Sequence, residues 1–68
     1  MATLPERLEQ EIARVRDQVM PLYVAIGVEG FVAVSLMRVN LAAATRALAG
    51  YDAVEMLQAL KELEGHTV

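Results

Sequence analysis

The stretch that decides the fold covers residues 19–39 and reads VMPLYVAIGVEGFVAVSLMRV. Its only charged residue before Arg38 is Glu29. Residues 27–30, with the sequence GVEG, place two glycines between two apolar halves, which is typical of a helix stop followed by a turn. The stretch therefore predicts two helical arms side by side, an αα-hairpin whose tip is apolar on every face.

A first helix is predicted over about 4–26, upstream of this turn. Thr3-Leu4-Pro5-Glu6 has the pattern of a capping box with proline in the first turn. Pro21 lies inside the helix, removes one backbone donor and predicts a kink that costs about 3 kcal/mol if nothing relieves it. The apolar stripe that defines the helix has spacings of three and four residues and consists of Leu8, Ile12, Val15, Val19, Leu22 and Ile26.

Two more helices are predicted downstream, over 30–49 and 52–64. The helix over 30–49 has two apolar faces and one narrow polar stripe, so it must be covered on more than one side. Gly50 is expected to end it, and Asp52 is a good N-cap for the third helix. The predicted fold is all-α, one domain over 1–68 with loose ends at 1–3 and 65–68. The three helices are expected to assemble as a homodimeric helical bundle.

A β-hairpin over residues 22–39 is the competing fold for the central stretch, since many of its residues are β-branched. A half-buried strand alternates apolar and polar residues, and this stretch does not. The helical spacing also continues into both flanks. The helical interpretation is therefore favoured, with the β-hairpin left open.

Composition excludes several classes of protein. The chain has 68 residues, of which 56% are hydrophobic, and it contains no cysteine, so neither a disordered chain nor a disulfide scaffold is expected. Nine acids against six bases give a net charge of −3, which disfavours nucleic-acid binding. A signal peptide has a basic segment followed by an apolar one, and the first residues lack this pattern. A cytoplasmic location is therefore expected.

No pattern of residues indicates a chemical reaction. The sequence contains no glycine-rich phosphate loop, no paired-carboxylate site and no nucleophile next to a base. We therefore predict that the protein is not an enzyme and uses no cofactor and no metal. His66, the single histidine, lies in the expected loose end and is discounted as a ligand.

The apolar tip has three interpretations. A chain shorter than about 70–80 residues rarely obtains more than about 3–5 kcal/mol from its own core, so the core of a homodimer is favoured. A docking surface for another protein and a membrane segment over residues 19–37 are the alternatives. The predicted dimer interface consists of Val19, Leu22, Tyr23, Ile26, Phe31, Val32, Leu36 and Val39.

Four further residues are candidates for binding a partner: Glu29, Arg38, Arg46 and Tyr51. The two arginines project from one stripe and are expected to pair with acids of the first helix or to anchor an acidic partner. The predicted function, reached by elimination, is a small bacterial or phage-encoded interaction protein, a homodimer that binds a larger bacterial protein and modulates or inhibits it. The alternatives are a small membrane-associated protein and a helical DNA-binding regulator.

Overall fold

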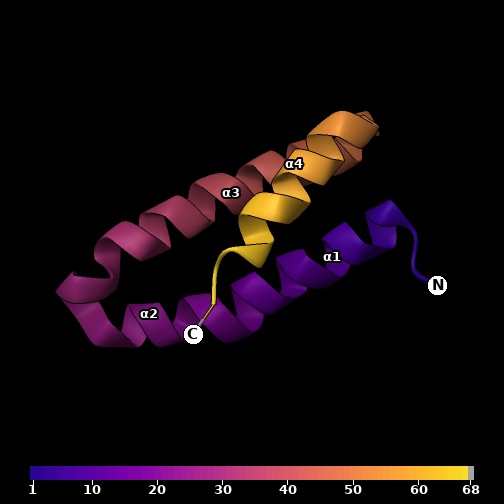
Figure 1. Cartoon of the computed structure of the whole chain (residues 1–68). Coiled ribbons are helices and arrows are strands. Elements are labelled where there is room, and N and C mark those ends of the chain that lie inside the picture. The colour runs from indigo at the N-terminus through magenta and orange to yellow at the C-terminus, as the bar shows by residue number, and fades with distance from the viewer. Residues whose placement is uncertain (68) are drawn as a thin grey trace.

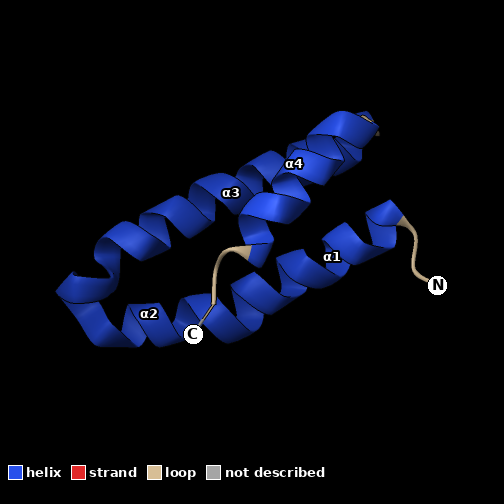
Figure 2. Cartoon of the chain, in the orientation of Figure 1, coloured by secondary structure: helices blue, strands red, loops and turns tan. Residues whose placement is uncertain are grey.

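The computed structural model describes residues 1–67, and over these residues it is entirely helical apart from short ends and one turn (Figures 1 and 2). The all-α prediction is confirmed. No strand occurs between residues 1 and 67, so the β-hairpin alternative for 22–39 is wrong. The elements, in chain order, are α1 (Leu4–Arg14), the π-helical η1 (Val15–Val19), α2 (Met20–Ile26), the 3₁₀-helical η2 (Gly27–Gly30), α3 (Phe31–Gly50) and α4 (Ala53–Glu64).

The prediction of three separate helices is wrong. Helical elements follow one another directly over 47 residues, from Leu4 to Gly50, so the described chain has two helices, this long one and α4. The glycine pair over 27–30 does not end the helix as expected, because it is itself a 3₁₀ turn within the helical run. The run folds back on itself at that turn, so that α2 packs against α3 (Figure 1).

The two helices begin at the predicted caps. The hydroxyl of Thr3 accepts the backbone N–H of Glu6 at 3.3 Å, and the Glu6 carboxylate accepts the backbone N–H of Thr3 at 3.3 Å. Asp52 accepts the backbone N–H groups of Val54 and Glu55 at 2.9 and 3.1 Å. These bonds satisfy backbone donors that a helix start leaves free. Because the bonded residues lie within three positions of each other, both helix starts could be predicted from the local sequence.

An irregular turn precedes Pro21. Residues Val15–Val19 are π-helical, and the backbone N–H of Met20 donates to the carbonyl oxygen of Val15, five residues back. In a regular α-helix the proline ring would collide with the carbonyl group of Asp17. The wider π-helical turn avoids that collision, and the helix continues through the proline.

The π-helical turn changes which side chains face inward. It holds one residue more than an α-turn, so the side chains after it are rotated by about 100° relative to a continuous α-helix. Val15 and Val19 are buried as predicted, but Leu22 and Ile26 are exposed. Tyr23 is half-buried in their place. The predicted apolar stripe therefore breaks at the proline.

The fold-back depends on two glycines. Gly27 has a φ of +82°, a conformation that L side chains rarely adopt. Gly30 is buried against α2, and a Cβ atom at this position would overlap the carbonyl oxygen of Tyr23. Each glycine is required for a different reason, one for backbone conformation and one for close approach.

The turn between α3 and α4 also differs from the prediction. Gly50 was expected to end the second helix but is its last helical residue, with a helical backbone and open space around it. Tyr51 instead takes the left-handed conformation, with a φ of 52°. A residue other than glycine pays roughly 1–2 kcal/mol for this conformation.

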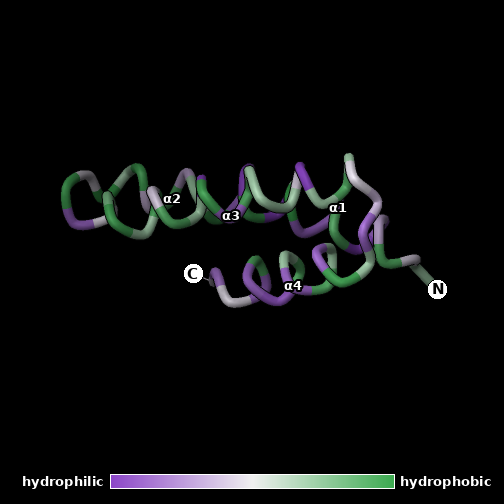
Figure 3. Tube along the Cα trace, turned by 90° about the horizontal axis from the view of Figure 1, so that it is seen from above, coloured by the Kyte–Doolittle hydropathy of each residue, from purple (hydrophilic) through white to green (hydrophobic). Residues whose placement is uncertain are grey.

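The core lies at one end of an elongated molecule of 35 × 21 × 16 Å. There α4 packs against both α1 and α3, while α2 and the start of α3 project beyond it (Figure 3). We call the projecting part, residues 20–39, the tip, and α1, α4 and residues 40–50 the base. The buried core cluster consists of Leu8, Val15, Val19, Met37, Ala44, Ala47, Met56, Ala59, Leu60 and Leu63.

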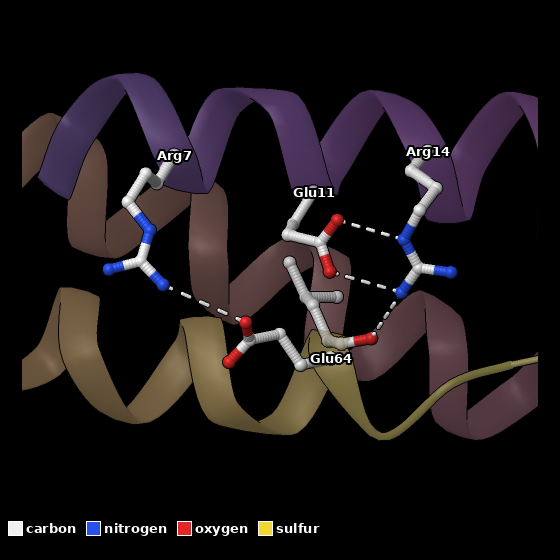
Figure 4. Close-up of polar contacts among 5 residues, drawn as sticks. Arg7, Glu11, Arg14 and Glu64 are labelled. Atoms are coloured by element: carbon white, nitrogen blue, oxygen red, sulfur yellow. Dashed lines mark hydrogen bonds and ion pairs between the residues drawn. The ribbon is translucent and has the colours of Figure 1, made fainter. Parts of the chain in front are cut away.

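Polar contacts tie α1 to the C-terminal end of α4 (Figure 4). The guanidinium group of Arg14 donates to both carboxylate oxygens of Glu11, at 2.8 and 3.1 Å, and to the carbonyl oxygen of Leu63 at 3.0 Å. The hydrogen bond to Glu11 raises the pKa of Arg14 above its usual value. Arg7 lies 3.8 Å from the carboxylate of Glu64. Arg14 thus satisfies one of the carbonyl groups that a helix end leaves free.

Candidate functional site

The tip exposes a large apolar surface. Its two arms cover each other only along one side, where Val34 and Met37 are buried. Eight other apolar side chains of the tip have exposed fractions between 48% and 91%: Leu22, Val24, Ile26, Val28, Phe31, Val32, Leu36 and Val39. Large contiguous apolar patches on a protein surface mark interaction sites, so this tip is the candidate functional site.

The eight predicted interface residues differ in how exposed they are. Six of the eight are exposed on the tip: Leu22, Ile26, Phe31, Val32, Leu36 and Val39. Val19 is only 1% exposed and belongs to the internal core. Tyr23 is half-buried, and its hydroxyl donates to the carbonyl oxygen of Thr67 at 2.7 Å. Val24 and Val28 are also exposed at the tip and lie outside the predicted interface.

One part of the exposed surface is a regular stripe along α3. Val32, Leu36 and Val39 follow each other at spacings of four and three residues, so they lie on one side of the helix. The next position in this pattern is Ala43, which is half-buried. Apolar residues at this spacing are the usual contact surface for another helix. We call these four residues the α3 stripe.

The α3 stripe leads into a groove between α3 and α4. The groove has a volume of about 300 Å³ and is lined by Ala43, Arg46, Glu55, Gln58, Ala59 and Glu62. The alanine side chains are the small members of this set, and the other four are polar. The groove can therefore receive an apolar side chain next to the alanines, with polar groups around it.

A second groove lies on the tip itself. It has a volume of about 220 Å³ and is lined by Val24, Gly27, Phe31, Val34, Ser35 and Arg38. Three of these residues are apolar with side chains of moderate or large size, and the guanidinium group of Arg38 adds one positive charge. This groove suits an apolar side chain with an acidic neighbour.

The four predicted partner-binding residues are all exposed. Glu29 lies in η2 at the end of the tip, and Arg38 and Arg46 each line one of the two grooves. Tyr51 lies at the opposite end, in the turn before α4. The expected pairing of the two arginines with acids of the first helix is not found within residues 1–67, where Glu11 pairs with Arg14 and Asp17 with Arg16.

Residues 66 and 67 make contacts that differ from the predicted loose end. A loose end was expected over 65–68, but His66 lies with its Nε2 atom 2.8 Å from the Nδ2 atom of Asn40. Thr67 accepts the hydroxyl of Tyr23, as described above, and Val68 lies outside the described residues. Asn40 is buried, and a single asparagine on an apolar helix face is the signal that could have indicated a polar partner inside the chain.

The long helical run is apolar enough to be examined as a membrane segment. Leu4–Gly50 contains an 18-residue window with a mean hydropathy of 1.9, of which 17% is buried. Core helices of soluble proteins and signal sequences reach the same length and hydropathy. The predicted segment 19–37 includes the fold-back at η2, so it forms the tip instead of one straight span.

Comparisons with protein families, with curated proteins and with solved structures give no match for this chain.

Proposed function

We propose that this chain is a small non-enzymatic interaction protein that forms a homodimer through the tip and, as a dimer, binds a larger protein and modulates it. One observation carries the proposal: eight exposed apolar side chains gather on residues 22–39, and Glu29 and Arg38 are the only charges among them. Exposed apolar area of this kind is stabilised when another surface covers it.

A dimer interface of standard size would take up a minor part of the surface of this chain. A specific interface removes about 800 Å² from each partner. That is less than a fifth of the 4543 Å² of accessible surface of this chain. The α3 stripe shares no residue with the groove that contains Phe31 and Arg38, so a second copy on the stripe can leave this groove to the larger partner.

Self-association is tested by light scattering and sedimentation equilibrium over a range of protein concentrations. We expect a dimer for the natural chain and a large shift toward monomer for Leu36→Ser, because the substitution places a hydroxyl group in the apolar interface. Leu57→Ser on α4 is the matched control, since Leu57 is also exposed but lies outside the tip. A natural chain that stays monomeric at micromolar concentration contradicts the proposal.

A membrane surface is the second candidate, and it has a specific observation of its own. The apolar window of the long helical run is mostly exposed, as lipid contact requires. The chain contains no tryptophan, so Phe31→Trp gives a single fluorescent reporter on the tip. A blue shift and co-flotation with phospholipid vesicles would favour the membrane. An emission spectrum that vesicles leave unchanged, together with a dimer in solution, favours the first proposal.

A further inference from the structure

We infer that two copies of this chain pair through the α3 stripe as antiparallel helices, in the one register that places Val32 against Ala43 of the second copy. This inference rests on the self-association proposed above and specifies its geometry. In this register the two-fold axis passes between positions 37 and 38, and Leu36 faces Val39 of the second copy.

The stripe is self-complementary in size when it is read antiparallel. The side chains at its two ends differ, since Val32 is exposed on the tip and Ala43 is small and lies in the α3–α4 groove. An antiparallel pair places the larger residue against the smaller one at both ends, and Leu36 and Val39 alternate in the middle. Alternation of large and small side chains across facing positions lets two surfaces interdigitate.

The groove between α3 and α4 provides the place for Val32 of the second copy. Ala43 comes from α3 and Ala59 from α4, and both line this groove of about 300 Å³. The tip of one copy would therefore lie over the base of the other. Val32, which the base of its own chain leaves exposed, would be covered by the base of the second chain.

Charge supports the same orientation. Continued by one further step in each direction, the spacing of the stripe reaches Glu29 before Val32 and Arg46 after Ala43. The antiparallel register brings Glu29 near Arg46 of the second copy twice in each dimer, and Arg46 forms no ion pair among residues 1–67. A parallel pair would place Glu29 beside Glu29 and Arg46 beside Arg46, and like charges that face each other are unfavourable.

Cysteine cross-linking tests the register cleanly, because the natural chain has no cysteine. Val32→Cys and Ala43→Cys variants, one of them carrying a mass tag, are first checked for dimer formation, then mixed, left to exchange subunits and oxidised. We expect a disulfide between the two variants in the mixture. Neither variant alone should cross-link, since equal positions are about 16 Å apart along an antiparallel pair in this register, beyond the reach of a disulfide.

A charge exchange is the second measurement. Glu29→Arg and Arg46→Glu should each raise the dimer dissociation constant by about tenfold, because two pairs per dimer become repulsive. The double variant should return it to near the natural value. If the single substitutions acted only by destabilising the monomer, the double variant would not recover the natural dissociation constant.

The outcomes separate this inference from the proposal on which it rests. A monomer in solution overturns both. A dimer whose variants cross-link at equal positions, 32 with 32 or 43 with 43, overturns the antiparallel register and leaves self-association intact. A dimer that forms neither kind of cross-link shows that another part of the tip is used, and this also overturns the register.

Discussion

The tip of this molecule is built from more apolar sequence than the base, yet its apolar side chains are the more exposed. In the base, α4 covers α1 and α3, so that Leu8, Leu60 and Leu63 are almost completely buried. In the tip, only two arms are present, and residues such as Phe31 and Val32 remain exposed. The difference is the presence of α4 and not the hydrophobicity of the chain, so whether an apolar residue is buried here depends on what covers it.

Removing a core side chain from the base should give the largest effect. Leu63 is fully buried at the end of α4, and Leu63→Ala is expected to lower the free energy of unfolding by about 2–5 kcal/mol. Leu57→Ala in the same helix is the control, because Leu57 is about half exposed and should cost much less. Urea unfolding followed by circular dichroism measures both, and equal losses would mean that the base is not a packed core.

The tip should be most sensitive at its turn. Gly30→Ala is expected to cost about 1–3 kcal/mol, because the added methyl group meets the carbonyl oxygen of Tyr23 and the turn must move. Gly50→Ala is the matched control: Gly50 is helical with open space around it, so the same substitution should stabilise by about 0.5–1 kcal/mol. Thermal unfolding midpoints that shift in the same direction for both variants would contradict this account.

The polar ties of the base should give a smaller effect. Arg14→Met removes the hydrogen bond to the Leu63 carbonyl oxygen and should cost about 1–2 kcal/mol, since hydrogen bonds from charged donors are stronger than average. Arg16→Met should change stability by less than about 0.5 kcal/mol, because Arg16 pairs only with its exposed neighbour Asp17. Chemical denaturation of the two variants side by side makes the comparison.

The smallest effect expected is a pH effect at the junction of base and tip. The hydrogen bond from Arg16 lowers the pKa of the Asp17 carboxyl group below its ordinary value. A lowered pKa in the folded state means that the pair contributes stability above the unfolded value of about 3.9, and that this contribution is lost as the pH falls through the folded pKa. In NMR titrations the pKa of Asp17 should rise in Arg16→Gln. An unchanged value would show that the pair does not form in solution.

The features that sequence could predict are those that depend on neighbours along the chain. Both caps, at Thr3 and Asp52, are made within three residues, and the surplus of apolar faces on the central stretch follows from counting. The count of helices was wrong because α2 and α3 are joined directly by a 3₁₀ turn, although Gly27 within it has a positive φ.

Features that depend on distant contacts or on backbone strain could not be predicted from neighbouring residues in the sequence. The exposure of Leu22 and Ile26 follows from a π-helical turn whose cause, Pro21, was expected only to bend the helix. The contact of His66 with Asn40 joins residues 26 positions apart. On the candidate site, sequence identified which residues are apolar, and the structure was needed to show that Val19 is internal and Val28 is exposed.

The π-helical turn at Val15–Val19 also has a consequence for how this chain can vary in length. The turn stores one residue more than an α-turn, so deleting one exposed residue within it, such as Gln18, would return the backbone to a regular α-helix. Val19 and Tyr23 would keep facing the core after such a deletion, whereas a deletion in the middle of α3 would rotate everything beyond it. Length variants of this protein should therefore concentrate at residues 15–19, provided that Pro21 is replaced at the same time.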